Sequence, residues 1–80
     1  MRTRPSKPEG LLLKTLGRAI RERREAMGLS QEELGDLSAL HRTYIGSVER
    51  GERNITLTGI KKISMALQLS AAELIKRAES

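Results

Sequence analysis

The stretch that decides the fold is residues 29–51, which reads LSQEELGDLSALHRTYIGSVERG. It opens with Ser30 and, three residues later, Glu33, the capping-box spacing that begins a helix. Leu34 and Leu37 supply an apolar face for that helix. Small residues follow, as a tight turn into a second helix requires. The stretch therefore predicts two short helices joined by a tight turn.

The second of these helices is predicted over residues 41–50, with Ile45 and Val48 pointing inward. Its remaining positions are predicted to project outward and are mostly polar or basic: His41, Arg42, Thr43, Tyr44 and Ser47. The major groove of B-DNA is wide enough for one α-helix. A protruding helix with such side chains is therefore a candidate for insertion into duplex DNA.

Three of the outward side chains have chemistry that suits base edges. The guanidinium of Arg42 can bind guanine O6 and N7 together, and the alternative is a phosphate contact. Thr43 suits the methyl group of thymine, and Ser47 can hydrogen-bond either type of base. His41, at the start of the helix, is interpreted either as a phosphate contact or as a residue without a special role.

The rest of the chain predicts three further helices and no strand. Apolar residues recur at helical spacing over residues 11–27, and Thr56 begins a helix that reaches about residue 67. Ser70 and Glu73 repeat the capping-box spacing before a last helix. We therefore expect an all-α domain over residues 11–80, preceded by a flexible basic arm over residues 1–10.

Composition narrows the function classes. The 80 residues form one domain, and with no cysteine and one histidine we expect no metal site and no cofactor. The single tyrosine is the only aromatic residue, which argues against stacking of single-stranded bases. No glycine-rich phosphate loop or nucleophile is present, so the chain is not expected to be an enzyme or to bind a small-molecule ligand. No apolar run is long enough to cross a membrane, so a cytoplasmic, nucleoid-associated protein is expected.

The formal net charge of +5 favours a polyanionic partner, but the charge is unevenly placed. Residues 1–27 carry eight basic and three acidic residues, whereas residues 28–54 carry three basic and five acidic ones. The predicted reading helix thus lies in an acidic segment. Any binding of DNA phosphates there must depend on the placement of a few side chains rather than on bulk charge.

Two charged residues fall on inward-facing positions. Arg24 lies four residues after Ile20 on the apolar stripe of the first helix, and Glu49 lies four residues after Ile45. Both are poorly placed for solvent, so we predict that Arg24 and Glu49 form a partly buried ion pair. Loss of one partner from such a pair costs several kcal/mol because the other charge is left uncompensated.

The chain resembles the phage-repressor-like (Cro/cI, XRE) family of helix-turn-helix domains over about residues 13–76. The resemblance is carried by IRERR at 20–24, GLSQEEL at 28–34, HRTYI at 41–45 and VERG at 48–51. It implies a compact five-helix, lambda-repressor-like fold with Arg42, Thr43 and Ser47 nearest the bases. It also implies a set of phosphate contacts from the two helices and the loop after them: Gln31, His41, Tyr44, Arg50, Arg53 and Asn54.

The turn between the two helices departs from the family pattern at Ala39, where glycine is usual. If that position needs a positive φ, alanine adds about 1 kcal/mol of strain, and otherwise the turn differs slightly.

The C-terminal part carries more apolar residues than one side of a small core needs. We assign four of them to a two-fold interface: Leu67, Leu69, Leu74 and Ile75. Such a homodimer would place two reading helices about 34 Å apart and bind a palindrome.

The predicted function is sequence-specific binding of double-stranded DNA by a transcriptional regulator that occludes a promoter or contacts RNA polymerase. A domain of this size looks like the controller proteins of restriction–modification systems or a small phage-type repressor. The alternative is an antitoxin of the same fold that binds a toxin and autoregulates its operon.

Overall fold

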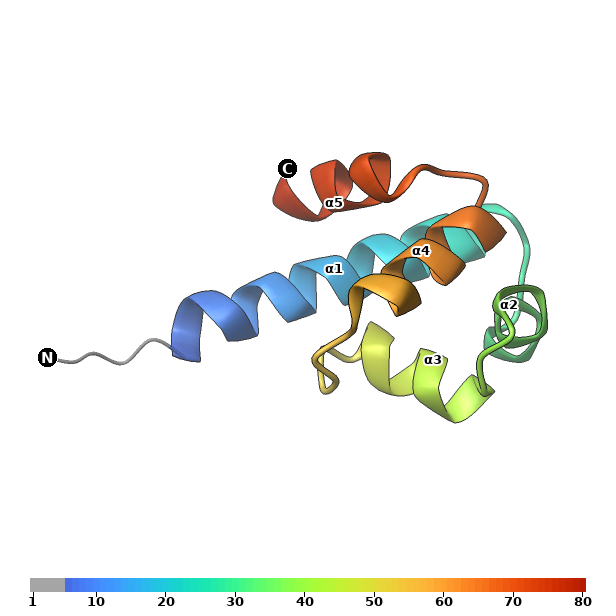
Figure 1. Ribbon diagram of the computed structural model, residues 1–80, viewed down its shortest axis with the longest axis horizontal. Coiled ribbons are helices and arrows are strands. Elements are labelled where there is room, and N and C mark those ends of the chain that lie inside the picture. Colours follow the sequence, from blue (N-terminus) through green and yellow to red (C-terminus); the bar gives the residue numbers. More distant parts are fainter. Residues whose placement is uncertain (1–5) are drawn as a thin grey trace, which may run out of the picture.

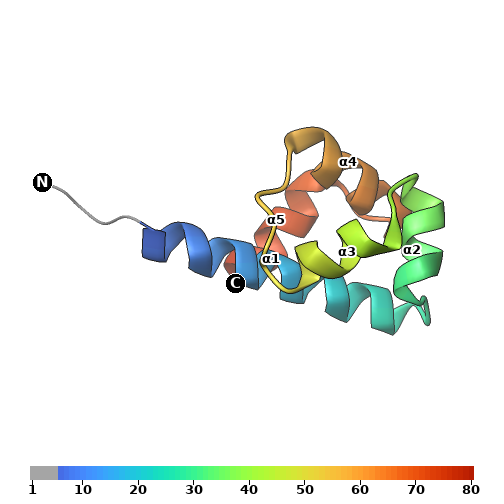
Figure 2. The same ribbon diagram turned by 90° about the horizontal axis from the view of Figure 1, so that it is seen from below.

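The computed structural model describes residues 6–80 as five helices without a strand, which confirms the predicted all-α fold. The helices are α1 (Ser6–Ala26), α2 (Gln31–Ser38), α3 (Arg42–Glu49), α4 (Leu57–Ala66) and α5 (Ala71–Glu79). Helix α1 forms the long axis of the molecule, with α4 and α5 on one side of it and α3 on another (Figure 1). Helix α2 lies across the end at which α1 finishes, as the view from below also shows (Figure 2).

Helix α1 begins earlier than the sequence analysis placed it. Residues 6–10, expected in the arm, are helical, and the rest of the expected arm, residues 1–5, lies outside the described residues. Pro8 and Gly10 suggested a loop. A proline in the first turn of a helix is nevertheless tolerated, because its missing N–H would have no partner within the helix.

The predicted helix starts are confirmed in atomic detail. The Ser30 hydroxyl accepts from the Glu33 backbone N–H at 2.9 Å, and the Glu33 carboxylate accepts from the Ser30 backbone N–H at 2.8 Å. Ser70 and Glu73 repeat both bonds at 3.0 and 2.7 Å, and Thr56 caps α4 through the backbone N–H of Gly59. Each cap satisfies backbone donors that the first turn of a helix otherwise leaves free.

The core is aliphatic and draws on all five helices. Its buried hydrophobic residues are Leu16, Ala19, Ile20, Leu34, Ile45, Val48, Ile63, Leu67, Leu74 and Ala78. Leu37 and Leu57, which the helical spacing placed on apolar faces, are instead exposed. These short helices pack through fewer positions than their apolar residues would allow.

The predicted dimer interface is wrong for two of its four residues. Leu67 and Leu74 have no exposed surface, because α4 and α5 close over the core at these positions. A second subunit therefore cannot contact either side chain. Leu69 and Ile75 are partly buried and pack against the same core.

Candidate nucleic-acid interface

The turn between α2 and α3 holds α3 at the surface of the molecule. Ala39 ends α2 in the left-handed conformation, at φ 60° and ψ 38°, and the backbone N–H of Leu40 donates to Gly35 O at 2.9 Å. Ile45 and Val48 then anchor α3 in the core. The positive φ that a glycine would accommodate is thus adopted by an alanine, at a cost of about 1–2 kcal/mol relative to a right-handed residue.

The N-terminal turn of α3 presents the side chains expected nearest the bases. His41 is the N-cap, and its ring Nδ1 accepts a hydrogen bond from the backbone N–H of Thr43 at 3.0 Å. This capping role was not foreseen, and it leaves the other ring nitrogen free to face a ligand. Arg42 and Thr43 are exposed, as predicted.

Ser47 does not project outward as expected. The residue is 9% exposed, and its hydroxyl donates to the backbone oxygen of Tyr44 at 2.8 Å. It lies one turn after Thr43, at a point where α3 turns towards the body of the protein. The expectation that Ser47 is an outward, base-facing residue is therefore wrong for this conformation.

Arg24 and Glu49 form the predicted ion pair. Arg24 Nε and Nη2 donate to the Glu49 carboxylate at 2.6 and 3.0 Å, and the two side chains are 10% and 3% exposed. Arg24 Nη1 also donates to Leu29 O at 2.8 Å. The carboxylate that accepts these bonds raises the pKa of Arg24 above its ordinary value, against the opposing effect of burial. The pair ties the end of α1 to the end of α3.

Glu49 also reaches the proposed DNA face, through Gln31. Gln31 Nε2 donates to Glu49 Oε1 at 3.1 Å, so the first side chain of α2 is held by the buried pair. A Cβ at Gly46 would lie 3.4 Å from Gln31 Oε1 and 3.1 Å from Arg50 Nη1. Glycine at position 46 thus makes room for the two side chains expected to bind phosphate, and brings Gln31 and Arg50 together over α3.

The loop after α3 adds a second group of cations. The Arg53 guanidinium lies 5.1 Å from the centre of the Tyr44 ring, within the range of a cation–π contact. Arg53 and Asn54 are exposed, whereas Tyr44 is partly buried against the core. The expected phosphate-binding residues therefore gather in two groups, one over Gly46 and one beside Tyr44.

Two acidic residues at this face were missed by sequence reasoning. Glu32 Oε1 lies 3.8 Å from Arg42 Nη1, and Glu52 Oε1 lies 3.1 Å from Arg50 Nε. All four side chains are more than half exposed, so each pair contributes little to stability. The local excess of acidic residues was the available signal. It did not identify which arginine each acid approaches.

The comparisons agree with this architecture. A family model described as "Helix-turn-helix" matches residues 20–74. The chain belongs to the XRE-type helix-turn-helix family. As a member it is a DNA-binding transcriptional regulator of the controller-protein type, and not an enzyme.

Three relatives illustrate the similarity. Control protein C.SmaI from Serratia marcescens is 48% identical over 62 residues, which cover 78% of this chain and 74% of the relative. Control protein C.BamHI from Bacillus amyloliquefaciens is 43% identical over 60 residues, or 74% of each chain. The crystal structure of the restriction-modification controller protein C.AhdI from Aeromonas hydrophila matches with a TM-score of 0.76 and 50% identity. That match covers 78% of this chain and 94% of the other.

Within residues 6–80, none of the helices has the length and apolar character needed to cross a bilayer. Neither the fold nor the comparisons test the antitoxin alternative, which stays a prediction.

Proposed function

We propose that this protein acts as a homodimer that binds a palindromic operator through α3 and thereby controls transcription from a nearby promoter in the cytoplasm. The similarity to controller proteins supports a role in timing the expression of restriction–modification genes. In this proposal Arg42 and Thr43 read base edges, while Gln31, Arg50 and Arg53 bind phosphates. His41, Tyr44 and Asn54 complete the phosphate contacts at the two ends of α3.

The observation that carries this proposal is the placement of Gln31 and Arg50 over Gly46 on an uncovered helix. The buried Glu49 carboxylate accepts from one hydrogen of the Gln31 amide. The second hydrogen of the same amide remains available to an anion. A side chain already held in place loses less conformational entropy on binding. The ion pair in the core thus supports the phosphate contact at the surface.

The charges of this face favour binding that depends on geometry. Glu32 and Glu52 stand beside Arg42 and Arg50 in the free protein. Entry of DNA would require each arginine to exchange its carboxylate for a base edge or a phosphate. Because non-specific DNA offers phosphates but not the correct base edges, the acids would weaken non-specific binding more than specific binding.

The test is selection of duplexes from a random pool, followed by sequencing of those retained. We expect one enriched palindrome whose half-sites lie about 10 base pairs apart, centre to centre. Arg42→Ala should relax the preference at one position of each half-site, whereas Arg21→Ala, an exposed change on α1, should select the wild-type sequence. A retained pool without any enriched sequence would overturn the proposal.

A further inference from the structure

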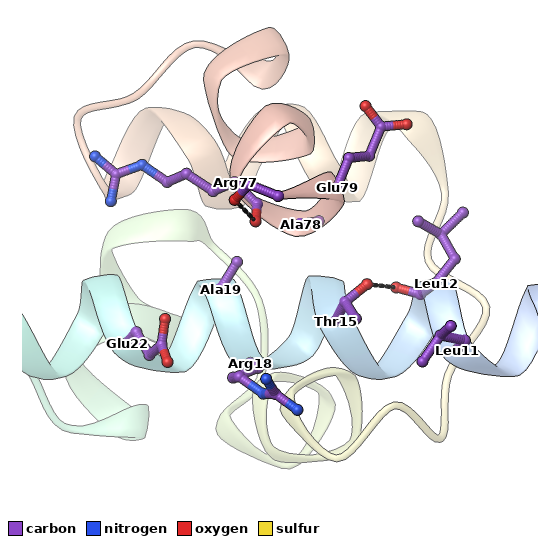
Figure 3. Close-up of a pocket in the computed structure, with 10 residues that line it drawn as sticks. Leu11, Leu12, Thr15, Arg18, Ala19, Glu22, Arg77, Ala78 and Glu79 are labelled. Carbon is purple, nitrogen blue, oxygen red and sulfur yellow. Dashed lines mark hydrogen bonds between the residues drawn. The ribbon is translucent and has the colours of Figure 1, made fainter.

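A groove between α1 and α5 is left unused by the DNA-binding face. Leu11, Leu12 and Ala19 line it from α1, and Ala78 lines it from α5. Figure 3 shows Ala19 pointing from α1 towards α5, and Leu12 beside the end of α5 that carries Glu79. Leu11 and Leu12 are 65% and 47% exposed, so the groove offers two large apolar side chains to solvent. Adjacent exposed leucines beside a groove indicate a surface that a partner covers.

The charges around the groove show which partner suits it. Arg18 and Glu22 border it on α1, and Arg77 and Glu79 border it on α5. None of these four exposed residues forms an ion pair with any other residue in the range 10–80. Two positive and two negative charges give this border no net charge, in a chain whose net charge is +5. A strongly acidic or basic partner would gain no net attraction here.

A second copy of this chain satisfies these charges. In a two-fold interface the same patch meets itself, so that each residue contacts a different residue of the other copy in both directions. A patch that carries both signs on opposite walls can then place its arginines against the glutamates of its partner. We propose that the α1–α5 groove is the surface through which two copies of this protein associate. This deepens the proposed homodimer and rests on it.

The position of the groove suits paired DNA reading. Both views place the C-terminal end of α5 and the loop between α3 and α4 towards the end from which α1 projects (Figures 1 and 2). A two-fold axis through this end, roughly perpendicular to α1, puts both α3 helices on the same side of the dimer. Leu11 and Leu12 on the projecting part of α1 would reach across to the second copy. The buried Leu67 and Leu74 take no part.

Sedimentation velocity at tens of micromolar, without DNA, tests the apolar part of this proposal. Wild type should sediment as a dimer, and Leu12→Lys as a monomer with an unchanged circular-dichroism spectrum. Leu37→Lys is the matched control, because Leu37 is also an exposed leucine but lies on α2, away from the groove. A monomeric wild type, or a dimeric Leu12→Lys variant, would overturn the proposal.

The charges allow a stricter test. One double variant, Arg18→Glu with Arg77→Glu, gives a border with four acids, and another, Glu22→Arg with Glu79→Arg, gives one with four bases. Each variant alone should be monomeric because its like charges repel, and an equimolar mixture should form a heterodimer. A mixture that stays monomeric would contradict self-complementary association.

DNA binding by the monomeric variant separates the two proposals. Leu12→Lys should still bind a duplex that carries a single selected half-site, while its affinity for the full palindrome falls at least tenfold. Loss of half-site binding as well, with the fold intact, would contradict the assignment of Leu12 to association alone.

Discussion

The most demanding test of the core is Glu49→Ala. Three hydrogen bonds converge on this carboxylate, from Arg24 Nε at 2.6 Å, Arg24 Nη2 at 3.0 Å and Gln31 Nε2 at 3.1 Å. Truncation removes all three and leaves the Arg24 guanidinium, on a side chain 10% exposed, with only its bond to the carbonyl of Leu29. A buried cation without its counter-ion is among the costliest defects that one substitution can create.

The expected loss is about 3–5 kcal/mol in the free energy of unfolding, the range for breaking one partner of a buried pair. A domain of this kind has about 5–15 kcal/mol in total, so the variant would lose a large share of its stability. Because each kcal/mol shifts the midpoint of a domain this size by about 4–8 °C, the Tm should fall by at least about 12 °C.

Urea unfolding followed by far-ultraviolet circular dichroism measures this loss directly. Arg21→Ala is the matched control, since Arg21 and Glu25 form an exposed ion pair at 3.2 Å whose removal should cost less than about 1 kcal/mol. The double variant Arg24→Met with Glu49→Leu should recover most of the loss, because no buried charge is then left unpaired. If Glu49→Ala unfolds at the same urea concentration as Arg21→Ala, the reasoning about this pair is refuted.

Three further predictions concern the turn, the phosphate contacts and the last helix. Ala39→Gly should raise the free energy of unfolding by up to about 1 kcal/mol in the same assay, because relief of the positive-φ strain outweighs the extra flexibility of glycine in the unfolded chain; a destabilised variant would count against strain in this turn. Arg50→Ala should weaken binding equally on selected and scrambled duplexes and reduce the salt slope by about 1 per subunit, whereas a loss confined to the selected duplex would mean that Arg50 reads bases. The Ser70 backbone N–H, by donating to the Glu73 carboxylate, lowers the pKa of Glu73. This stabilising contribution is therefore present above the ordinary carboxyl pKa and lost as the pH falls through the lowered value, as NMR titration of Glu73 should show; a pKa at or above the ordinary value would contradict the cap.

Features that depend on a few neighbouring residues were predicted well from the sequence. Ser30 with Glu33, and Ser70 with Glu73, form both bonds of a capping box, because that geometry is set within one turn of helix. The Arg24–Glu49 pair was also predicted, although its partners are 25 positions apart. Each charge lies on an apolar stripe, and a charge buried on each of two packed helices needs the other.

Features that depend on how the helices pack were predicted less well. Helical spacing says which residues share a face but not how far the neighbouring helix covers that face. Ser47 was placed outward and is nearly buried, whereas Leu37 was placed inward and is exposed. Leu67 was assigned to an interface, although the core needs it. Spacing also could not show that Gln31 bonds to Glu49, because that contact arises only when three helices meet.

The central claim is that α3 distinguishes one order of bases from another, and a competition titration measures this most directly. Fluorescence anisotropy at physiological salt would compare the selected duplex with a scrambled one of the same composition. Wild type should prefer the selected duplex by about 10³-fold or more. Arg42→Ala should lose about 1–3 kcal/mol of that preference, mainly through weaker binding to the selected duplex. Equal affinity of the wild-type protein for both duplexes would contradict the claim.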